Sequence, residues 1–253
     1  SCCISATINK YVYVLVKKRY DNKIYLKYSK NEVVDVNHID DIEHDFIRET
    51  LKFMNVTYGV EIINWADIPT KGTGLGSSSS FLVGLLLALH TLEGRTPSKE
   101  ALCTQSTYIE IDKCEKPIGV QDHYAATHGG FNKMDFGEDV NRGSYKKVTG
   151  FGLCDQELRE ISEHLHLFYT GVTRESKDIL TIQNENLIND NEVINHMHEN
   201  VAVAQTLSEE LVKKNFNSIP SALRQNWELK KKIAGNISNQ ELDNLCDRAL
   251  TIG

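Results

Sequence analysis

The sequence predicts an α+β fold, and three observations support this prediction. The first half of the 253-residue chain alternates between β-rich runs and helical patterns. The second half is mainly helical with few strands, and the change falls between residues 150 and 164. Hydrophobic residues make up 40% and charged residues 25%, as in soluble globular proteins that bury a core. We therefore expect two domains, residues 1–155 and 156–253.

Strands are expected at the start of the chain. Residues 8–16 (INKYVYVLV) are rich in β-formers, and residues 23–28 (KIYLKY) alternate in character. Asp21 and Asn22 suit a turn between them, so we expect a β-hairpin. Residues 38–53 carry apolar side chains at helical spacing, which predicts a single amphipathic helix.

The stretch from residue 60 to residue 92 has a specific order. An apolar run at 60–63 predicts a strand, and Pro69 then opens a loop that contains Gly72, Gly74 and Gly76. Four serines follow, and residues 81–92 are apolar on nearly every face, which predicts a buried helix. Glycines let a backbone approach a ligand closely, and a helix N-terminus presents free N–H groups. This order predicts an anion site, most commonly for phosphate.

Two known nucleotide-binding motifs do not fit this loop. A Walker loop ends in Lys-Ser or Lys-Thr, which this loop lacks, so we exclude it. A dinucleotide fingerprint that starts at Gly72 would require glycine where Ser77 stands. A flexible turn before a core helix remains open on the residues of the loop alone.

Further elements are expected along the rest of the chain. Ser98 suits an N-cap, Lys116-Pro117-Ile118-Gly119 a turn, and residues 129–130 (Gly-Gly) a helix end. The predicted helices are 99–113, 121–127, 176–215, 221–234 and 240–250. The predicted strands are 129–136, 144–148 and 165–169.

Two carboxylates are candidates for chemistry. Phosphoryl transfer needs a phosphate cradle, Mg²⁺ and a group that orients or deprotonates the attacking hydroxyl. Glu110 has apolar neighbours on a predicted helix, which suggests partial burial, and a carboxylate is a hard ligand that suits Mg²⁺. Asp122 follows a Pro-Gly turn and is the candidate base. The ordinary alternatives are a surface carboxylate for Glu110 and an N-cap aspartate for Asp122.

Pro69 with the run Gly74-Leu75-Gly76-Ser77-Ser78 resembles the phosphate loop of the GHMP small-molecule kinases. Four residues separate the proline from this run, where three are usual in the family. Glu110 and Asp122 are twelve residues apart, as in the family. The resemblance implies that Ser78 and Glu110 hold Mg²⁺, with Ser77 as the alternative serine, and that Asp122 takes the hydroxyl proton. It implies that ATP is bound by Pro69, Gly72, Gly74, Leu75, Gly76, Ser77, Ser78 and Ser79.

Further runs resemble the branch of this family that phosphorylates heptose 7-phosphate at its anomeric hydroxyl. They are residues 8–14 (INKYVYV), 116–126 (KPIGVQDHYAA), 129–132 (GGFN), 168–171 (FYTG) and 227–230 (WELK). The resemblance implies an N-terminal mixed α/β domain of the ribosomal S5 domain 2-like type and a C-terminal ferredoxin-like α+β domain. It also implies transfer of the ATP γ-phosphate to a sugar phosphate, giving the 1,7-bisphosphate.

Lys10 and Arg174 are candidates for the phosphate of the sugar, because cations recognise phosphate and arginine does so with two hydrogen bonds. The alternative for each is a solvated surface cation. Two further alternatives stay open for the whole protein. One is a fucose- or galactose-type kinase, and the other is a catalytically silent regulator that binds nucleotide or sugar.

The family has a glycine-rich, substrate-contacting segment before the opening strand and a second glycine-rich motif late in its C-terminal domain. Neither lies between Ser1 and Gly253, so we expect flanking sequence in the complete protein. The net charge of −7 argues against nucleic-acid binding, and no apolar run reaches the length of a membrane span. Six scattered cysteines indicate free thiols in a reducing cytoplasm. We expect a cytoplasmic protein with small-molecule partners, and leave a homodimer open.

Overall fold

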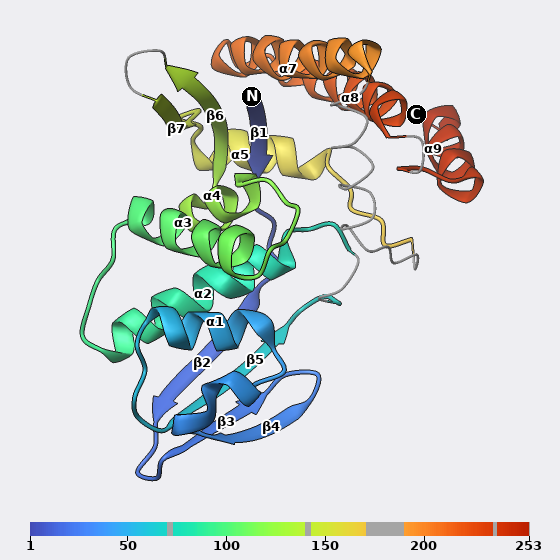
Figure 1. Ribbon diagram of the computed structural model, residues 1–253. Helices are drawn as coiled ribbons and strands as arrows, with labels where there is room; N and C mark the ends of the chain where they lie inside the picture. Colours follow the sequence, from blue (N-terminus) through green and yellow to red (C-terminus); the bar gives the residue numbers. More distant parts are fainter. Residues whose placement is uncertain (70–72, 140–142, 171–189, 235–236, 253) are drawn as a thin grey trace. The chain divides into compact units, whose positions relative to one another are not determined.

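The computed structural model describes residues 1–69, 73–139, 143–170, 190–234 and 237–252 (Figure 1). The chain divides into two compact units: the first is Thr7–Gly129, and the second combines Ser1–Ala6 with Gly130–Gly253. The division near Gly129 differs from the expected boundary at residue 155. It reflects the pairing of the first strand of the chain with strands that follow Gly130. The boundary at residue 155 stays a prediction.

The first unit contains a four-stranded mixed sheet of order β2-β5-β3-β4. Its strands are β2 (Val12–Lys18), β3 (Lys23–Lys27), β4 (Asn31–Asp35) and β5 (Val60–Ala66). β5 runs antiparallel to β2 and parallel to β3, and β3 runs antiparallel to β4. The strand predicted at residues 60–63 is confirmed as β5 and lies in the interior of the sheet.

The predicted hairpin between residues 8–16 and 23–28 is wrong. β5 lies between β2 and β3, and pairs with β2 from Val12 opposite Ala66 to Lys18 opposite Val60. The hairpin of this sheet joins β3 to β4 instead. Val60 and Ile62 are buried, and a central position satisfies both backbone edges of the strand that carries them, which an edge position would not.

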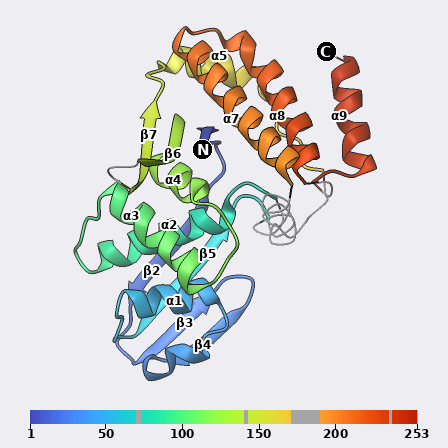
Figure 2. The same ribbon diagram turned by 45° about the horizontal axis from the view of Figure 1, so that its top comes forward.

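Helices cover one face of this sheet in two layers (Figures 1 and 2). They are α1 (Asp45–Phe53), α2 (Ser77–Leu92), α3 (Lys99–Thr107), the π-helix η2 (Tyr108–Lys113) and α4 (Gln121–His128). α2 packs on β2 on one side and on α3 and α4 on the other. Its leucines Leu82, Leu85, Leu86 and Leu89 are fully buried, which explains why the helix is apolar on nearly every face.

The single helix predicted at residues 38–53 is wrong in one respect. The structure has a 3₁₀-helix, η1 (Val36–Asp41), and then α1, with extended backbone at Ile42 and His44 between them. The backbone N–H of Glu43 donates to the carboxylate of Glu32 on β4, at 2.8 Å. A side chain from another element therefore satisfies this N–H group at the break, and the helical pattern of the sequence cannot record such a partner.

The second unit contains an antiparallel sheet of order β1-β6-β7, with helices from the second half of the chain. The strands are β1 (Cys2–Ala6), β6 (Phe131–Asp139) and β7 (Gly143–Gly150). The helices are α5 (Asp155–Glu163), α7 (Asn191–Val212), η3 (Phe216–Ser218), α8 (Ile219–Ile233) and α9 (Gln240–Ile252). The strands predicted near 129–136 and 144–148, and the helices predicted at 221–234 and 240–250, are confirmed.

The strand predicted at residues 165–169 is wrong, because no strand is formed there. Its side chains are largely exposed, Phe168 at 81%, and no described strand pairs with it. A β-rich run becomes a strand only where a neighbour accepts its backbone hydrogen bonds. Of the helix predicted at 176–215, residues 176–189 lie outside the described part, and α7 forms Asn191–Val212 of the remainder. Within the described residues, no helix is long and apolar enough to cross a membrane.

A close backbone contact in the first unit gives a test of this fold. The backbone N–H of Arg19 donates to the carbonyl of Gly59 at 2.8 Å, and a Cβ atom at Gly59 would lie 1.9 Å from the carbonyl oxygen of Asp21. We expect Gly59→Ala to lower the free energy of unfolding by about 3 kcal/mol, because neither backbone segment can yield without losing hydrogen bonds. Urea denaturation measures this.

Gly119→Ala is the matched control. Gly119 is exposed, and a Cβ atom there would meet no heavy atom within 4 Å. We expect its unfolding free energy to stay within about 0.5 kcal/mol of the parent protein. Equal stability of the two variants would contradict the packing of Gly59 against Asp21.

Candidate active site

The N-terminus of α2 is built for an anion. Gly76 precedes the helix with a left-handed φ of 68°, and Gly74 has the same φ. No side chain caps α2, and its first turn contains no acidic residue, whereas α3 is capped by the hydroxyl of Ser98 as the sequence predicts. The N–H groups of this first turn and the positive end of the helix dipole are therefore available to a phosphate.

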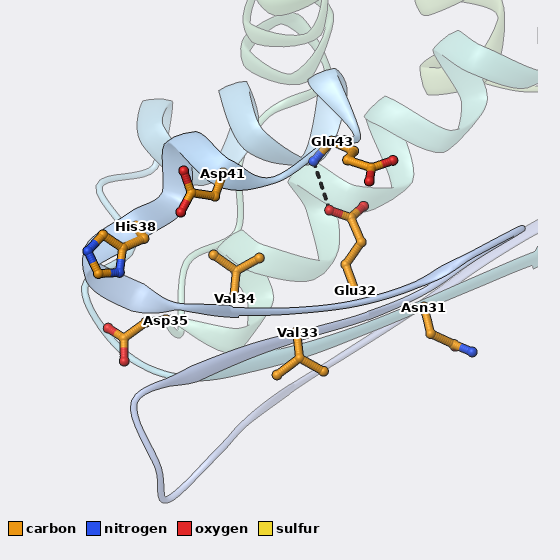
Figure 3. Close-up of a pocket in the computed structure, with 8 residues that line it drawn as sticks. All are labelled: Asn31, Glu32, Val33, Val34, Asp35, His38, Asp41 and Glu43. Carbon is orange, nitrogen blue, oxygen red and sulfur yellow. Dashed lines mark hydrogen bonds between the residues drawn. The ribbon is translucent and has the colours of Figure 1, made fainter.

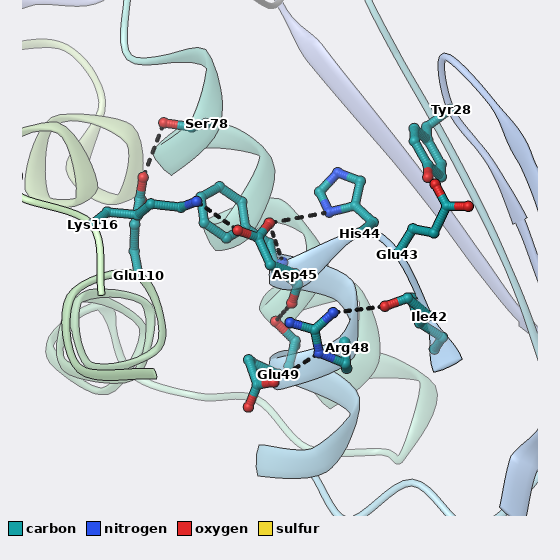
Figure 4. Close-up of polar contacts among 12 residues, drawn as sticks. Tyr28, Ile42, Glu43, His44, Asp45, Arg48, Glu49, Ser78, Glu110 and Lys116 are labelled. Atoms are coloured by element: carbon teal, nitrogen blue, oxygen red, sulfur yellow. Dashed lines mark hydrogen bonds and ion pairs between the residues drawn. The ribbon is translucent and has the colours of Figure 1, made fainter. Parts of the chain in front are cut away.

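The serines of this turn lie in different environments. Ser78 is exposed, and its hydroxyl donates to Oε1 of Glu110 at 3.1 Å (Figure 4). Ser79 is buried, and its hydroxyl donates to Oε2 of Glu110 at 3.0 Å. Ser77 is also buried. The structure thus brings together Ser78 and Glu110, the two metal ligands that the sequence predicts.

Glu110 is the most deeply buried carboxylate of the site, with 2% of its surface exposed. It lies on η2, a π-helical turn, and such turns are frequent at functional sites. The ring atom Nε2 of His123 lies 2.8 Å from Oε2 of Glu110, and His123 is fully buried. His123 was not among the candidates predicted from the sequence, and its position directly after Asp122 in α4 is the signal that could have identified it.

Asp122 lies on the first turn of α4 and is exposed. A Cβ atom at Gly76 would lie 3.4 Å from Cγ of Asp122 and 3.7 Å from its Oδ1. The Asp122 carboxyl group therefore stands directly beside the glycine that starts α2. The candidate base and the candidate phosphate site are adjacent, as the resemblance implies.

The loop before α4 is held in two ways (Figure 4). The backbone N–H of Lys116 donates to the carbonyl of Glu110 at 3.1 Å, and its ammonium lies 2.6 Å from Oδ2 of Asp45 on α1. The hydrogen bond to Asp45 raises the pKa of Lys116. Burial is the largest single influence on Asp45 and alone would raise its pKa. The hydrogen bond and the charge of Lys116, together with the backbone N–H of Phe46, outweigh burial, so the pKa is lowered. The ion pair therefore persists at neutral pH and connects this loop to α1.

The other residues predicted to bind substrate or ATP lie outside this group of contacts or outside the described residues. Lys10 is exposed just before β2, where the backbone N–H of Tyr11 donates to Oδ2 of Asp67 at 2.9 Å. This contact ties the start of β2 to the chain that leads into the loop. Pro69 and Leu75 are exposed in the loop, and Gly72 and Arg174 lie outside the described residues.

The donor set fits Mg²⁺. Ser78 and Glu110 supply hard oxygen atoms, which Mg²⁺ prefers, and Mg²⁺ commonly takes its other ligands from water and nucleotide phosphates. Among the described residues no group of three or more His, Cys, Asp or Glu side chains could hold a metal ion. Two protein oxygens beside a phosphate site therefore suit a metal ion that is held jointly with a nucleotide.

A cavity of about 430 Å³ lies elsewhere in the first unit, between β4 and η1 (Figure 3). Its lining is acidic, and Glu32 in its wall is already bonded to the backbone of Glu43. None of Ser78, Glu110 and Asp122 lines it. An acidic wall disfavours phosphates, so this cavity is no candidate for the reaction.

Comparisons with known proteins find similarity over the region that contains these residues. Residues 43–130, which include Ser78, Glu110 and Asp122, match the model of the GHMP kinases N terminal domain. The chain is 27% identical over 260 aligned positions to D-glycero-alpha-D-manno-heptose 7-phosphate kinase of Campylobacter jejuni subsp. jejuni serotype O:2, an alignment that covers 99% of this chain and 75% of the relative.

Solved structures show the fold. A D-glycero-D-manno-heptose 1-phosphate kinase from Bacteriodes thetaiotaomicron has a TM-score of 0.74 at 21% identity, covering 91% of this chain and 71% of the other. Lactococcus lactis galactokinase complexed with galactose has a TM-score of 0.64 at 16% identity, covering 98% and 74%. The α+β class is confirmed, and the chain has the fold of these kinases. Together, the family match and the curated relative confirm that this chain resembles the GHMP kinases.

Proposed function

We propose that this protein is an ATP- and Mg²⁺-dependent sugar kinase that transfers the γ-phosphate to the anomeric hydroxyl of D-glycero-D-manno-heptose 7-phosphate. The observation that carries the proposal is the position of the Asp122 carboxyl beside Gly76, at the same helix N-terminus where Ser78 meets Glu110. A base, a metal-ligand pair and a phosphate cradle therefore meet within one compact unit.

In the proposed reaction, the first turn of α2 binds the ATP phosphates through its N–H groups. Ser78 and Glu110 hold Mg²⁺, which neutralises phosphate charge when it is bound. Asp122 orients the sugar hydroxyl and accepts its proton. The hydroxyl oxygen forms a bond to the γ-phosphorus, the bond from that phosphorus to the β,γ-bridging oxygen breaks, and ADP leaves with the electron pair. The sugar 1,7-bisphosphate is the second product.

The choice of heptose 7-phosphate is supported by the curated relative, which bears that substrate in its name. The structural neighbour named for a heptose 1-phosphate differs in the position of the phosphate, so both isomers need to be compared. Lys10 and Arg174 are the proposed contacts to the phosphate of the sugar. The cytoplasmic location and the homodimer stay predictions.

The acceptor panel is the first test. The complete protein is incubated with Mg²⁺-ATP and heptose 7-phosphate, heptose 1-phosphate, fucose, galactose, mevalonate or homoserine, and ADP release is measured. We expect turnover with heptose 7-phosphate. Turnover with another acceptor alone would keep the mechanism and replace the substrate. Bound ATP without turnover across the panel would instead favour the silent regulator.

Asp122→Asn tests the base. We expect kcat to fall roughly 10²–10⁴-fold, because the amide cannot accept the hydroxyl proton. The affinity for Mg²⁺-ATP should stay unchanged, which equilibrium binding of a non-hydrolysable ATP analogue measures. Near-normal turnover of this variant would remove Asp122 from the role of base.

Glu110→Gln tests the metal ligand. We expect the Mg²⁺ concentration for half-maximal turnover to rise by at least about 10-fold, because an amide oxygen binds Mg²⁺ more weakly than a carboxylate. Asp112→Asn on the same helix is the matched control, since Asp112 is exposed, and it should keep the Mg²⁺ requirement of the parent protein. An unchanged requirement in Glu110→Gln would argue against this ligand.

A further inference from the structure

We propose that His123 is a positioning residue, which acts with Ser79 to fix one carboxylate oxygen of Glu110 so that the other oxygen faces Ser78. This inference rests on the proposed function, because it concerns how the metal ligand Glu110 is held. The role of His123 is to hold Glu110, and Asp122 remains the residue that meets substrate.

The two oxygens of Glu110 have different surroundings. Oε2 is approached by Oγ of Ser79 at 3.0 Å and by Nε2 of His123 at 2.8 Å, and both of these residues are buried. Oε1 accepts from Oγ of Ser78 at 3.1 Å, and Ser78 is exposed. The carboxylate therefore has an enclosed anchor side and an open side, and the open side is the one available to a metal ion.

The distance from His123 to Glu110 places the two side chains in direct polar contact. Nε2 lies 2.8 Å from Oε2, a distance at which a ring N–H group and a carboxylate oxygen attract each other. Neither ring nitrogen has a hydrogen-bond partner among the described residues, so the contact does not count as an aligned hydrogen bond. The attraction is therefore electrostatic, and it acts where both side chains are shielded from water.

A buried histidine without aligned partners is destabilising, because its ring nitrogens have lost water without gaining a hydrogen bond. Such a cost in a native structure calls for an explanation, and functional sites commonly supply one. In this site the ring approaches the same carboxylate oxygen of Glu110 as the hydroxyl of Ser79 does. Side chains that hold a metal ligand in this way orient it, and their loss typically lowers metal affinity about 10- to 100-fold.

The placement of His123 also follows from helix geometry. Successive residues of an α-helix point about 100° apart, so neighbours serve different faces. Asp122 is exposed beside Gly76, and His123 is buried against Glu110. One turn of α4 therefore carries both the base and the anchor of the metal ligand.

Two substitutions separate this role from simple packing. Glutamine at position 123 carries an N–H donor at the distance of Nε2, the atom that approaches Glu110. Asparagine carries its donor at the distance of Nδ1, whereas the contact with Glu110 is made by Nε2. The probe is the Mg²⁺ concentration required for half-maximal binding of a non-hydrolysable ATP analogue by the complete protein, with no acceptor sugar present.

We expect His123→Gln to stay within about 3-fold of the parent Mg²⁺ requirement, and His123→Asn to raise it about 10- to 100-fold. Affinity for the analogue without Mg²⁺ should be equal in all three proteins, and thermal unfolding without metal serves as the control for folding. Equal Mg²⁺ requirements in both variants, whether low or high, would overturn the proposal.

Ser79→Ala removes the hydroxyl that donates from α2 to the same Glu110 oxygen. This variant keeps the proposal testable if His123→Asn does not fold. It should also raise the Mg²⁺ requirement, and an unchanged requirement would overturn the anchor. The Mg²⁺ dependence of analogue binding by the parent protein separates a failure of this proposal from a failure of the proposed function. Analogue binding by the parent that is independent of Mg²⁺ would overturn both proposals, without any variant.

Discussion

The burial of the Glu110 carboxylate is the constraint on which the site depends. A carboxylate at 2% exposure is tolerated only with close polar partners, because an unpaired buried charge costs several kcal/mol. Its partners come from two helices, Ser78 and Ser79 from α2 and His123 from α4. The start of α2 and the first turn of α4 must therefore both meet η2, and that requirement places the proposed phosphate site and the proposed base.

The position of α2 between sheet and helices makes this convergence rigid. Its core leucines are fully buried, so the helix cannot shift without opening the apolar core. Its start is sharp because Gly76 takes a left-handed φ, which side chains rarely adopt. A Cβ atom there would lie 3.4 Å from Cγ of Asp122, so the carboxyl of the proposed base stands in contact distance of this turn.

Local patterns in the sequence predicted local features well, including β5, the buried α2, and the cap of α3 by Ser98. The Ser78–Glu110 pair followed from a family resemblance, since no periodicity links residues so far apart. Non-local partners were not predictable. The strand that separates β2 from β3, and the Glu32 contact that interrupts the helical pattern, belong to distant segments. His123 was missed because burial of one polar residue depends on tertiary packing.

The twelve-residue spacing between Glu110 and Asp122 has a geometric cause in this structure. The carbonyl of Glu110 accepts from the backbone of Lys116, whose side chain is held by Asp45 on α1. The loop then turns through Ile118, whose N–H donates to the carbonyl of Lys116, and α4 begins at Gln121. The segment from Glu110 to Asp122 is therefore held by hydrogen bonds and by the start of α4. An inserted residue would rotate Asp122 away from Gly76 and carry His123 away from Glu110, so the same spacing serves the proposed base and the proposed anchor together.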